Sequence, residues 1–161
     1  MTTKGYERFS ADLAEFANTL GIELDKAIRK VSLDVFTGIV KKTPVDKGAL
    51  RANWAIGVNK EVTKRPLDKG VKLSAGAAES AAMKDVSHLS KVKAGDRVII
   101  SNNMPYARVV EYGEIKGDGP KTVGGYSKQA PRGMVRVTLA EVEGEMACDA
   151  EFTAMMDLPK E

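Results

Sequence analysis

The first third of the chain has the hydrophobic spacing of amphipathic helices. Apolar residues recur at every third or fourth position, and charged residues lie between them. This period places the apolar side chains on one helical face, and it predicts two helices, roughly 6–20 and 22–42, with a break near Gly21. Pro44 disfavours helix at the residue before it, so the second helix is expected to end there. The apolar positions are Tyr6, Phe9, Leu13, Phe16, Leu20, Leu24, Ile28, Val31, Val35 and Ile39.

The period changes after residues 43–48, which have the proline and glycine of a turn. From 49 to 59, larger apolar residues occupy alternate positions, which predicts a strand with Trp54 on its buried face. β-branched residues predict a second strand at 97–102. Later elements are expected to be a short helix at 106–112 ended by Gly113, a flexible glycine-rich loop at 113–129, and a final helix opened by Pro131.

These elements predict an α+β fold class. Long N-terminal helices and a C-terminal helix would pack on a small, mainly antiparallel sheet, with long loops. Residues 60–95 are expected to form a long, basic, partly helical excursion between the two strands. The chain has 161 residues, enough for one domain with its own core. We expect residues 1–150 to form this single domain and residues 151–161 to form a C-terminal tail.

The composition excludes several kinds of catalytic and metal-binding site. There is one histidine, His88, and one cysteine, Cys148, which excludes multi-histidine metal sites, Cys-rich zinc sites and an intrachain disulfide. We therefore expect no enzyme activity, no catalytic residues, no metal and no cofactor. No run approaches the ~20 apolar residues of a membrane span, so no membrane partner is expected.

The formal net charge of +3 hides an asymmetry along the chain. Residues 60–133 carry 14 Lys and Arg against 8 Asp and Glu, whereas residues 134–161 carry 2 against 7. A basic middle and an acidic end can attract each other within a chain or between subunits, or they can attract an anionic partner. Composition by itself does not choose among these.

The candidate reactive residues have structural interpretations. Glu111 lies beside two tyrosines, but no second carboxylate or histidine accompanies it for acid–base work, so we expect it to pair with an arginine. His88 follows an Asp-Val-Ser run without a nucleophile-elbow motif, which indicates a surface histidine. The Lys47–Arg51 region lacks a phosphate-loop pattern and a following helix N-terminus, and Asp46 is expected to cap backbone amides in the turn.

Two motifs stand in a fixed order along the chain, Thr-Pro-Val-Asp-x-Gly-x-Leu-Arg leading to a tryptophan, and Asn-x-x-Pro-Tyr-Ala-x-x-Val-Glu-x-Gly. With a helix before and after them, they resemble the HK97 gp10-like family of tailed-bacteriophage neck, tail-completion or head–tail joining proteins. The resemblance spans about residues 30–142 and includes residues 130–138 as the start of the family's last helix. The motif residues are Thr43, Pro44, Val45, Asp46, Gly48, Leu50, Arg51, Trp54, Asn102, Pro105, Tyr106, Ala107, Val110, Glu111 and Gly113.

The resemblance implies a structural virion protein, made in the cytoplasm of the bacterial host and located at the head–tail junction. It implies a ring, a hexamer or dodecamer of the chain, that joins the portal or connector to the tail. Genomic DNA would pass through the lumen without sequence-specific binding. We expect the loops at 60–95 and 113–130 to contact the next subunit or other neck and tail proteins, with Lys64, Arg65 and Lys69 as candidate interface residues.

The basic middle also leaves a second interpretation open, that of a small basic nucleic-acid-binding protein. The basic run from 60 to 72 contains no aromatic residue on which bases could stack, and no helix-turn-helix or zinc-finger pattern is present. A hydrolase would need a catalytic set that these motifs do not supply.

Overall fold

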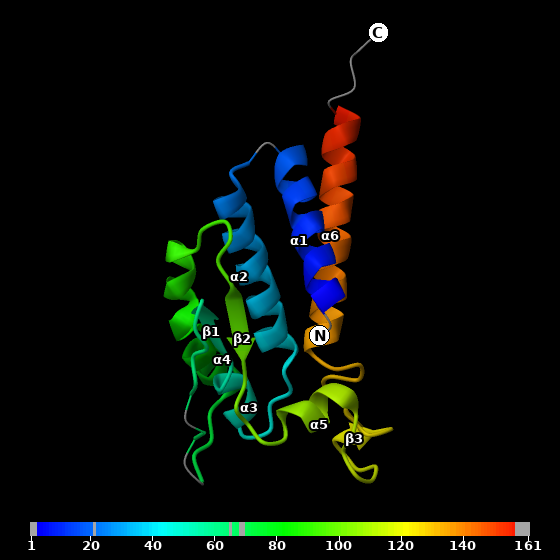
Figure 1. Ribbon diagram of the computed structural model, residues 1–161. Coiled ribbons are helices and arrows are strands. Elements are labelled where there is room, and N and C mark those ends of the chain that lie inside the picture. Colours follow the sequence, from blue (N-terminus) through cyan, green and yellow to red (C-terminus); the bar gives the residue numbers. More distant parts are fainter. Residues whose placement is uncertain (1–2, 21, 65, 68–69, 157–161) are drawn as a thin grey trace.

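The computed structural model describes residues 3–20, 22–64, 66–67 and 70–156. The two expected N-terminal helices are α1 (Thr3–Thr19) and α2 (Leu24–Lys42). Together with the C-terminal helix α6 (Val135–Met156), they form a layer in which each long helix packs on the other two (Figure 1). Small antiparallel sheets accompany these helices, so the predicted α+β fold class is confirmed.

α2 lies at the centre of the fold because apolar residues surround it. Val31, Val35 and Ile39 are buried at helical spacing, and Phe36 is fully buried on an adjoining face. The positive charges of its last turn complement the helix dipole. The helix ends at Lys42, immediately before Thr43 and Pro44, as the sequence predicts.

A two-stranded antiparallel sheet pairs β1 (Ala55–Val58) with β2 (Val98–Ser101). The strand expected from 49 begins later, because residues Ala49–Ala52 form the short helix α3. Gly48 has a left-handed backbone with φ of 78°, which turns the chain into this helix. The prediction of a strand over 49–54 is therefore wrong, although Trp54 is buried as expected.

The segment between these strands contains α4 (Ala75–Met83) and the 3-10 helix η1 (Lys84–Lys91), which confirms the expected partly helical excursion. Ser74 caps α4, since its hydroxyl accepts a hydrogen bond of 3.2 Å from the amide of Ala77. Both helices contact α2, and η1 also packs against β1. The excursion therefore contributes to the core.

The last third differs from the prediction at two places. α5 (Ala107–Tyr112) ends at Gly113 as expected, but residues 113–129 contain a hairpin of β3 (Thr122–Val123) and β4 (Tyr126–Ser127). Gly124 and Gly125 have positive φ angles, which suits the two-residue turn between these strands. α6 begins at Val135, four residues after Pro131, and it includes residues 151–156, where a tail was expected.

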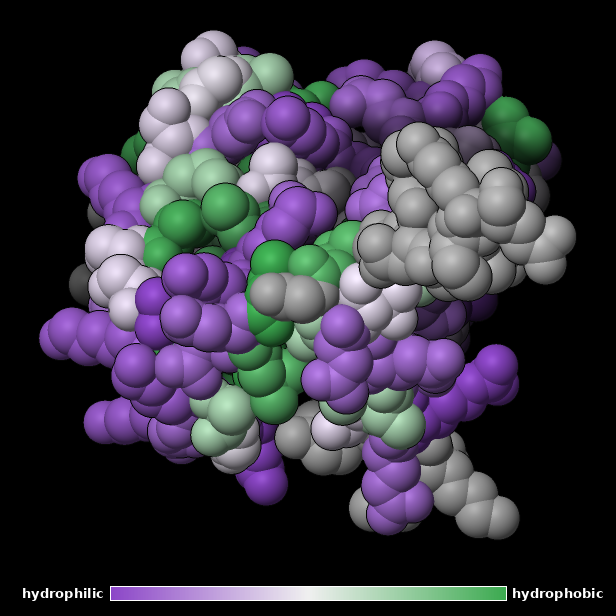
Figure 2. Space-filling view, turned by 90° about the horizontal axis from the view of Figure 1, so that it is seen from above, coloured by the Kyte–Doolittle hydropathy of each residue, from purple (hydrophilic) through white to green (hydrophobic). Residues whose placement is uncertain are grey.

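Figure 2 shows the surface that faces upward in Figure 1. This surface is mainly polar, and hydrophobic residues form a broken band across it. Ile22 and Leu24, each 37% exposed, belong to this end of the α1–α2 pair. Among the described residues, no helix is long and apolar enough to cross a membrane.

Candidate functional site

The first motif forms the joint between α2 and β1. The Thr43 hydroxyl donates to the carbonyl oxygen of Ile39 at 2.7 Å and accepts from Trp54 Nε1 at 2.7 Å. Arg51 donates from Nε and Nη2 to the carbonyl oxygen of Thr43, at 3.1 and 2.8 Å. Thr43 is fully buried, so these bonds satisfy groups that have no access to water.

The second motif is attached directly to the first. Asn102 Nδ2 donates to the carbonyl oxygen of Leu50 at 2.9 Å, and the amide of Asn103 donates to Asn53 Oδ1 at 2.7 Å. Asn102 Oδ1 also accepts from the amide of Met104, which shapes the turn before Pro105. The structure therefore brings together two motifs that are about fifty residues apart in the chain.

Gly48 connects the first motif to the excursion. The amide of Leu73 donates to the carbonyl oxygen of Lys47 at 3.1 Å. A Cβ atom on Gly48 would lie 2.8 Å from the Leu73 backbone oxygen, and the φ angle of 78° is one that other residues rarely adopt. Both the close approach and the backbone conformation require glycine here.

The turn residues also contact the hairpin region. Gln129 holds Val45 by two bonds: its Oε1 accepts from the Val45 amide at 2.9 Å and its Nε2 donates to the Val45 carbonyl oxygen at 3.2 Å. Asp46 accepts from Lys121 in the hairpin region, so the structure gives its carboxylate a lysine partner in place of the expected backbone cap.

Three lysines gather around Asp46 on the surface. The hydrogen bond from Lys121 is the main cause that lowers the pKa of Asp46, and the charges of Lys121, Lys47 and Lys72 lower it further. Asp46, Lys47, Lys72 and Lys121 are all exposed, and we call this group the Asp46 cluster. It carries more positive than negative charge, so it can contact an anionic surface.

Pro105 and Tyr106 of the second motif are exposed, and Tyr106 is close enough to Asp46 to be affected by its charge. Tyr106 is 42% exposed, and its pKa is raised by burial of part of the ring and then by the charge of Asp46. Ala107, the first residue of α5, is half-buried against the core.

Glu111 joins α5 to the start of α6. Its Oε2 accepts from the amides of Met134 and Val135 at 2.6 and 3.0 Å, and its Oε1 accepts from the amide of Arg136 at 3.1 Å. Arg136 Nε also donates to Oε1 at 3.2 Å. The expected arginine partner is confirmed, and the same carboxylate binds the first backbone amides of α6.

The electrostatics of Glu111 follow from this geometry. Burial, the largest contribution, raises its pKa, but the three backbone amides and the Arg136 side chain together outweigh it, so the pKa lies below its ordinary value. The guanidinium of Arg136 also lies 4.9 Å from the centre of the Tyr112 ring. Gly133 packs closely against Glu111, since a Cβ atom on Gly133 would lie 2.6 Å from the Glu111 carbonyl oxygen.

The candidate interface residue Lys64 is engaged inside the chain. Its ammonium donates to the carbonyl oxygens of Trp54 and Ala81 at 2.6 and 3.1 Å, and it lies 3.0 Å from Asp85 Oδ2. The Lys64 side chain is only 20% exposed. Arg65 and Lys69 lie outside the described residues, and their contact with a neighbour remains a prediction.

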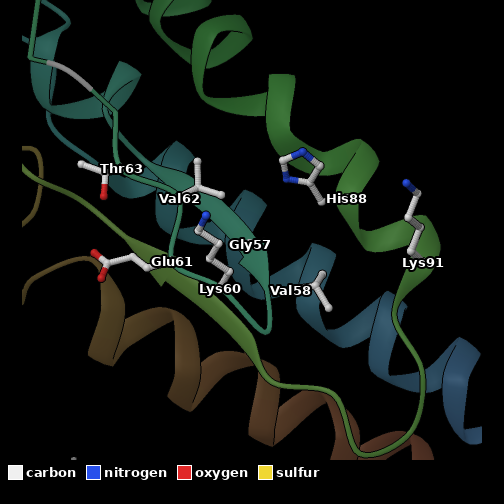
Figure 3. A pocket seen from close by; sticks show the side chains of 8 residues that line it. All are labelled: Gly57, Val58, Lys60, Glu61, Val62, Thr63, His88 and Lys91. Carbon is white, nitrogen blue, oxygen red and sulfur yellow. The ribbon is translucent and has the colours of Figure 1, made fainter.

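A shallow cavity of about 600 Å³ lies beside His88. It is lined by residues 57–58 and 60–63 from β1 and the following loop, and by His88 and Lys91 from η1 (Figure 3). His88 Nδ1 lies 3.2 Å from the Ile56 carbonyl oxygen, whereas the Asp85 carboxylate pairs with Lys64. The nearby Asp, Ser and His therefore do not form a triad.

The remaining candidate groups do not converge on a reactive centre. Cys148 is an exposed thiol on α6. Within the described ranges, no group of three or more His, Cys, Asp or Glu side chains is placed to hold a metal ion.

Two contacts of the site were not predicted from the sequence. The Glu111 cap joins residues 23 to 25 positions apart, and the Val45–Gln129 pair joins residues 84 positions apart. Pro131 and Gly133 mark an irregular helix start, a signal that α6 needs a partner for its first amides. No local pattern marks Gln129.

These features define a mixed α+β protein in which both motifs join secondary-structure elements. Residues 7–113 match the family model described as "Bacteriophage HK97-gp10, putative tail-component", so the chain belongs to this bacteriophage family. The match contains both motifs and ends at Gly113, so residues 130–138, expected to match, lie beyond it. Searches of curated proteins and of solved structures found no significant match.

Proposed function

We propose that this protein is a structural component of the bacteriophage particle that forms a ring at the head–tail junction. The ring would join the portal or connector to the tail and surround the channel for genomic DNA. Membership of a phage tail-component family over residues 7–113 is the observation that carries the proposal.

The charged surfaces support contacts between unlike faces. The Asp46 cluster presents the exposed side chains of Lys47, Lys72 and Lys121 around one carboxylate. α6 presents the exposed carboxylates of Glu143 and Glu145, and the structure pairs its Glu141 with Lys42 at 2.5 Å. In a cyclic ring each subunit uses two different surfaces, so the basic face of one copy can meet the acidic face of the next.

A charge-reversal variant tests this role in the phage. Lys47→Glu, Lys72→Glu and Lys121→Glu are combined in a phage that has no other copy of the gene, and particles are examined by electron microscopy. We expect unjoined heads and tails. The matched control reverses Lys26, Lys30 and Lys84, which are equally exposed and lie elsewhere. Normal yield of joined particles from the first variant, with correct folding in both, would contradict the proposal.

The excursion requires a separate test. Because Lys64 pairs with Asp85 inside the chain, Lys64→Glu is expected to destabilise the fold whatever its neighbours are. The informative variant is Arg65→Glu with Lys69→Glu, in which Lys64 is unchanged. Loss of assembly with unchanged thermal stability would support an interface role for this loop.

The Asp46 cluster also favours the second interpretation, a basic nucleic-acid-binding protein. In a gel-shift experiment with the purified protein, phosphate contacts weaken steeply with salt. Micromolar binding that is lost by about 0.3 M salt would favour that function. Absence of binding at low salt would leave the structural role.

A further inference from the structure

β2 is an edge strand with an open outer edge. In an antiparallel pair, alternate residues exchange hydrogen bonds with the neighbouring strand, and the residues between them direct their amide and carbonyl groups outward. The register pairs Gly57 with Ile99, and the amide of Asn59 donates to the carbonyl oxygen of Arg97 at 2.7 Å. Val98 and Ile100 therefore direct their backbone groups away from β1.

No described residue forms a hydrogen bond with those outward groups of Val98 and Ile100. The outer edge of β1 differs in part, because side chains contact the carbonyl oxygens of Ile56 and of Trp54, the residue just before the strand. His88 Nδ1 lies 3.2 Å from the carbonyl oxygen of Ile56, and Lys64 donates to that of Trp54. The burial of the two strands differs in the same way. The first three residues of β1 are buried, whereas all four residues of β2 are half-buried. Figure 1 shows β2 at the front of the molecule, with β1 as its strand neighbour.

The composition of β2 does not suit an edge in water. Proteins protect open edges with lysine, proline, a bulge or a covering loop, because a bare edge pairs with other strands. β2 is Val-Ile-Ile-Ser, with strong β propensity and no charge or proline. Ile99 is half-buried and lies on the sheet face opposite to the core-packed Val98 and Ile100. This strand has the features of one that has a second neighbour.

We propose that β2 pairs with β2 of a second copy of this chain, antiparallel about a two-fold axis at Ile99. The sequence of β2 favours a like strand, because its two outward-directed residues, Val98 and Ile100, are both apolar and stand symmetrically on either side of Ile99. By contrast, the strands of the hairpin are flanked by the bridges Gly119–Thr122 and Ser127–Ala130. Two like strands that pair antiparallel form a two-fold contact.

The register of this pairing is self-complementary. Val98 lies opposite Ile100 of the second copy, and the two such pairs satisfy all the outward amide and carbonyl groups of both residues. Arg97 lies opposite Ser101 and Asp96 opposite Asn102, so no like charges meet. Ile99 lies opposite Ile99 in a close, non-hydrogen-bonded position, which adds apolar contact.

The β2–β2 contact is a different contact from the one between neighbouring subunits of the proposed ring, because it joins two copies by the same strand. A two-fold contact cannot close a cyclic ring, and two rings joined back to back would present identical ends to the head and to the tail. The pairing therefore describes a dimer of the free chain, separate from the ring contact in the particle.

Exchange of charge at the axis tests the pairing. Ile99→Lys places two like charges opposite each other, and so does Ile99→Glu, whereas a mixture of the two variants places Lys opposite Glu. By analytical ultracentrifugation of the purified full chain, we expect self-association of the wild type, at least tenfold weaker association of each variant alone, and recovery in the mixture. Val123→Lys, an exposed apolar residue in the hairpin, is the control and should associate as the wild type does.

Val98→Pro is a second, independent variant. It removes an outward amide without loss of a bond to β1, and proline is tolerated at the first residue of an edge strand. Reduced association with retained circular dichroism is expected. A monomeric wild type, wild-type association of Ile99→Lys and Val98→Pro, or no recovery in the mixture would overturn the pairing. The ring proposal has its own test in the particle, so the two can fail separately.

Discussion

Single side chains hold the joint between α2 and β1. Thr43 is the central one, because its hydroxyl accepts from the only tryptophan of the chain and donates to the preceding turn of α2. Thr43 and Trp54 are both buried, so if one loses its hydrogen-bonding group, the polar atom of the other has neither a partner nor access to water. Such a loss costs more than the net gain from an ordinary hydrogen bond.

Thr43→Val should therefore destabilise the protein by about 1–3 kcal/mol, since it keeps the shape but removes the acceptor of Trp54 Nε1. Urea unfolding followed by the fluorescence of Trp54 measures this loss. Thr19→Val is the control: its hydroxyl makes the same type of bond, 2.8 Å to Glu15, at the surface. Its change should stay within about 0.5 kcal/mol. Equal losses in the two variants would contradict this account.

Glu111 acts at the start of α6 by charge as well as by hydrogen bonding. Its pKa is lowered in the folded protein, so the folded state favours the ionised carboxylate. The resulting stability is complete above the unfolded value of about 4.5 and is lost as the pH falls through the lower folded value.

Glu111→Gln should cost about 1–3 kcal/mol at pH 7, because one of its two accepting oxygens becomes a donor that faces backbone amides. The difference in stability between wild type and variant should shrink as the pH falls below about 4.5. Thermal unfolding between pH 7 and pH 3 measures both. A difference that stayed constant with pH would show that the charge has no part in the effect.

The packing of whole helices depends on small residues at close contacts. α2 and α6 approach each other at Gly38, where an added Cβ would lie 2.5 Å from Thr138 Cγ2. Thr138 is buried and its hydroxyl donates to the Met134 carbonyl oxygen at 2.7 Å, so its side chain cannot turn away without loss of that bond. The two helices must separate to admit a larger residue.

Gly38→Ala should destabilise the protein. Overpacking costs about 1–3 kcal/mol, whereas the better helix propensity of alanine returns about 1 kcal/mol or less. Gly144→Ala in α6 meets no atom within 4 Å, so only the propensity acts and a small gain is expected. Denaturant unfolding of the two variants decides this. A gain in both would show that the α2–α6 contact adapts without cost.

The distribution of charge over the molecule bears on assembly more than on the fold. The Asp46 cluster is basic, whereas α6 ends in a segment rich in carboxylates. Exposed charges act over a distance of about 8 Å at 0.15 M salt and about 3 Å at 1 M salt. Contacts between unlike charged faces therefore weaken with salt, and a contact made by backbone groups and isoleucine does so much less.

Two kinds of self-association should be separable by salt. At 1 M salt we expect the larger, ring-like assemblies to dissociate and pairs of copies joined through β2 to persist. Sedimentation velocity across a salt series measures both steps. Assemblies that are unaffected by salt would contradict a charge-based ring contact, and loss of the pairs before the rings would contradict the β2 contact.

Short-range patterns in the sequence determined much of the fold. The period of three to four residues located α1 and α2, β-branched residues located β2, and Gly113 marked the end of α5. These features depend on neighbours a few positions apart, so they can be predicted from sequence alone. The arginine partner of Glu111 was also expected from its chemistry, although Arg136 itself was not identified.

The tertiary structure decided the features that depend on distant partners. Residues 49–52 form a helical turn in a place where Gly48 meets Leu73, and α6 begins where Glu111 binds its first amides. Lys64 occupies an internal site because the carbonyl oxygens of two distant segments meet there. No local period encodes such contacts, because they exist only after the chain has folded and polar groups have lost their water.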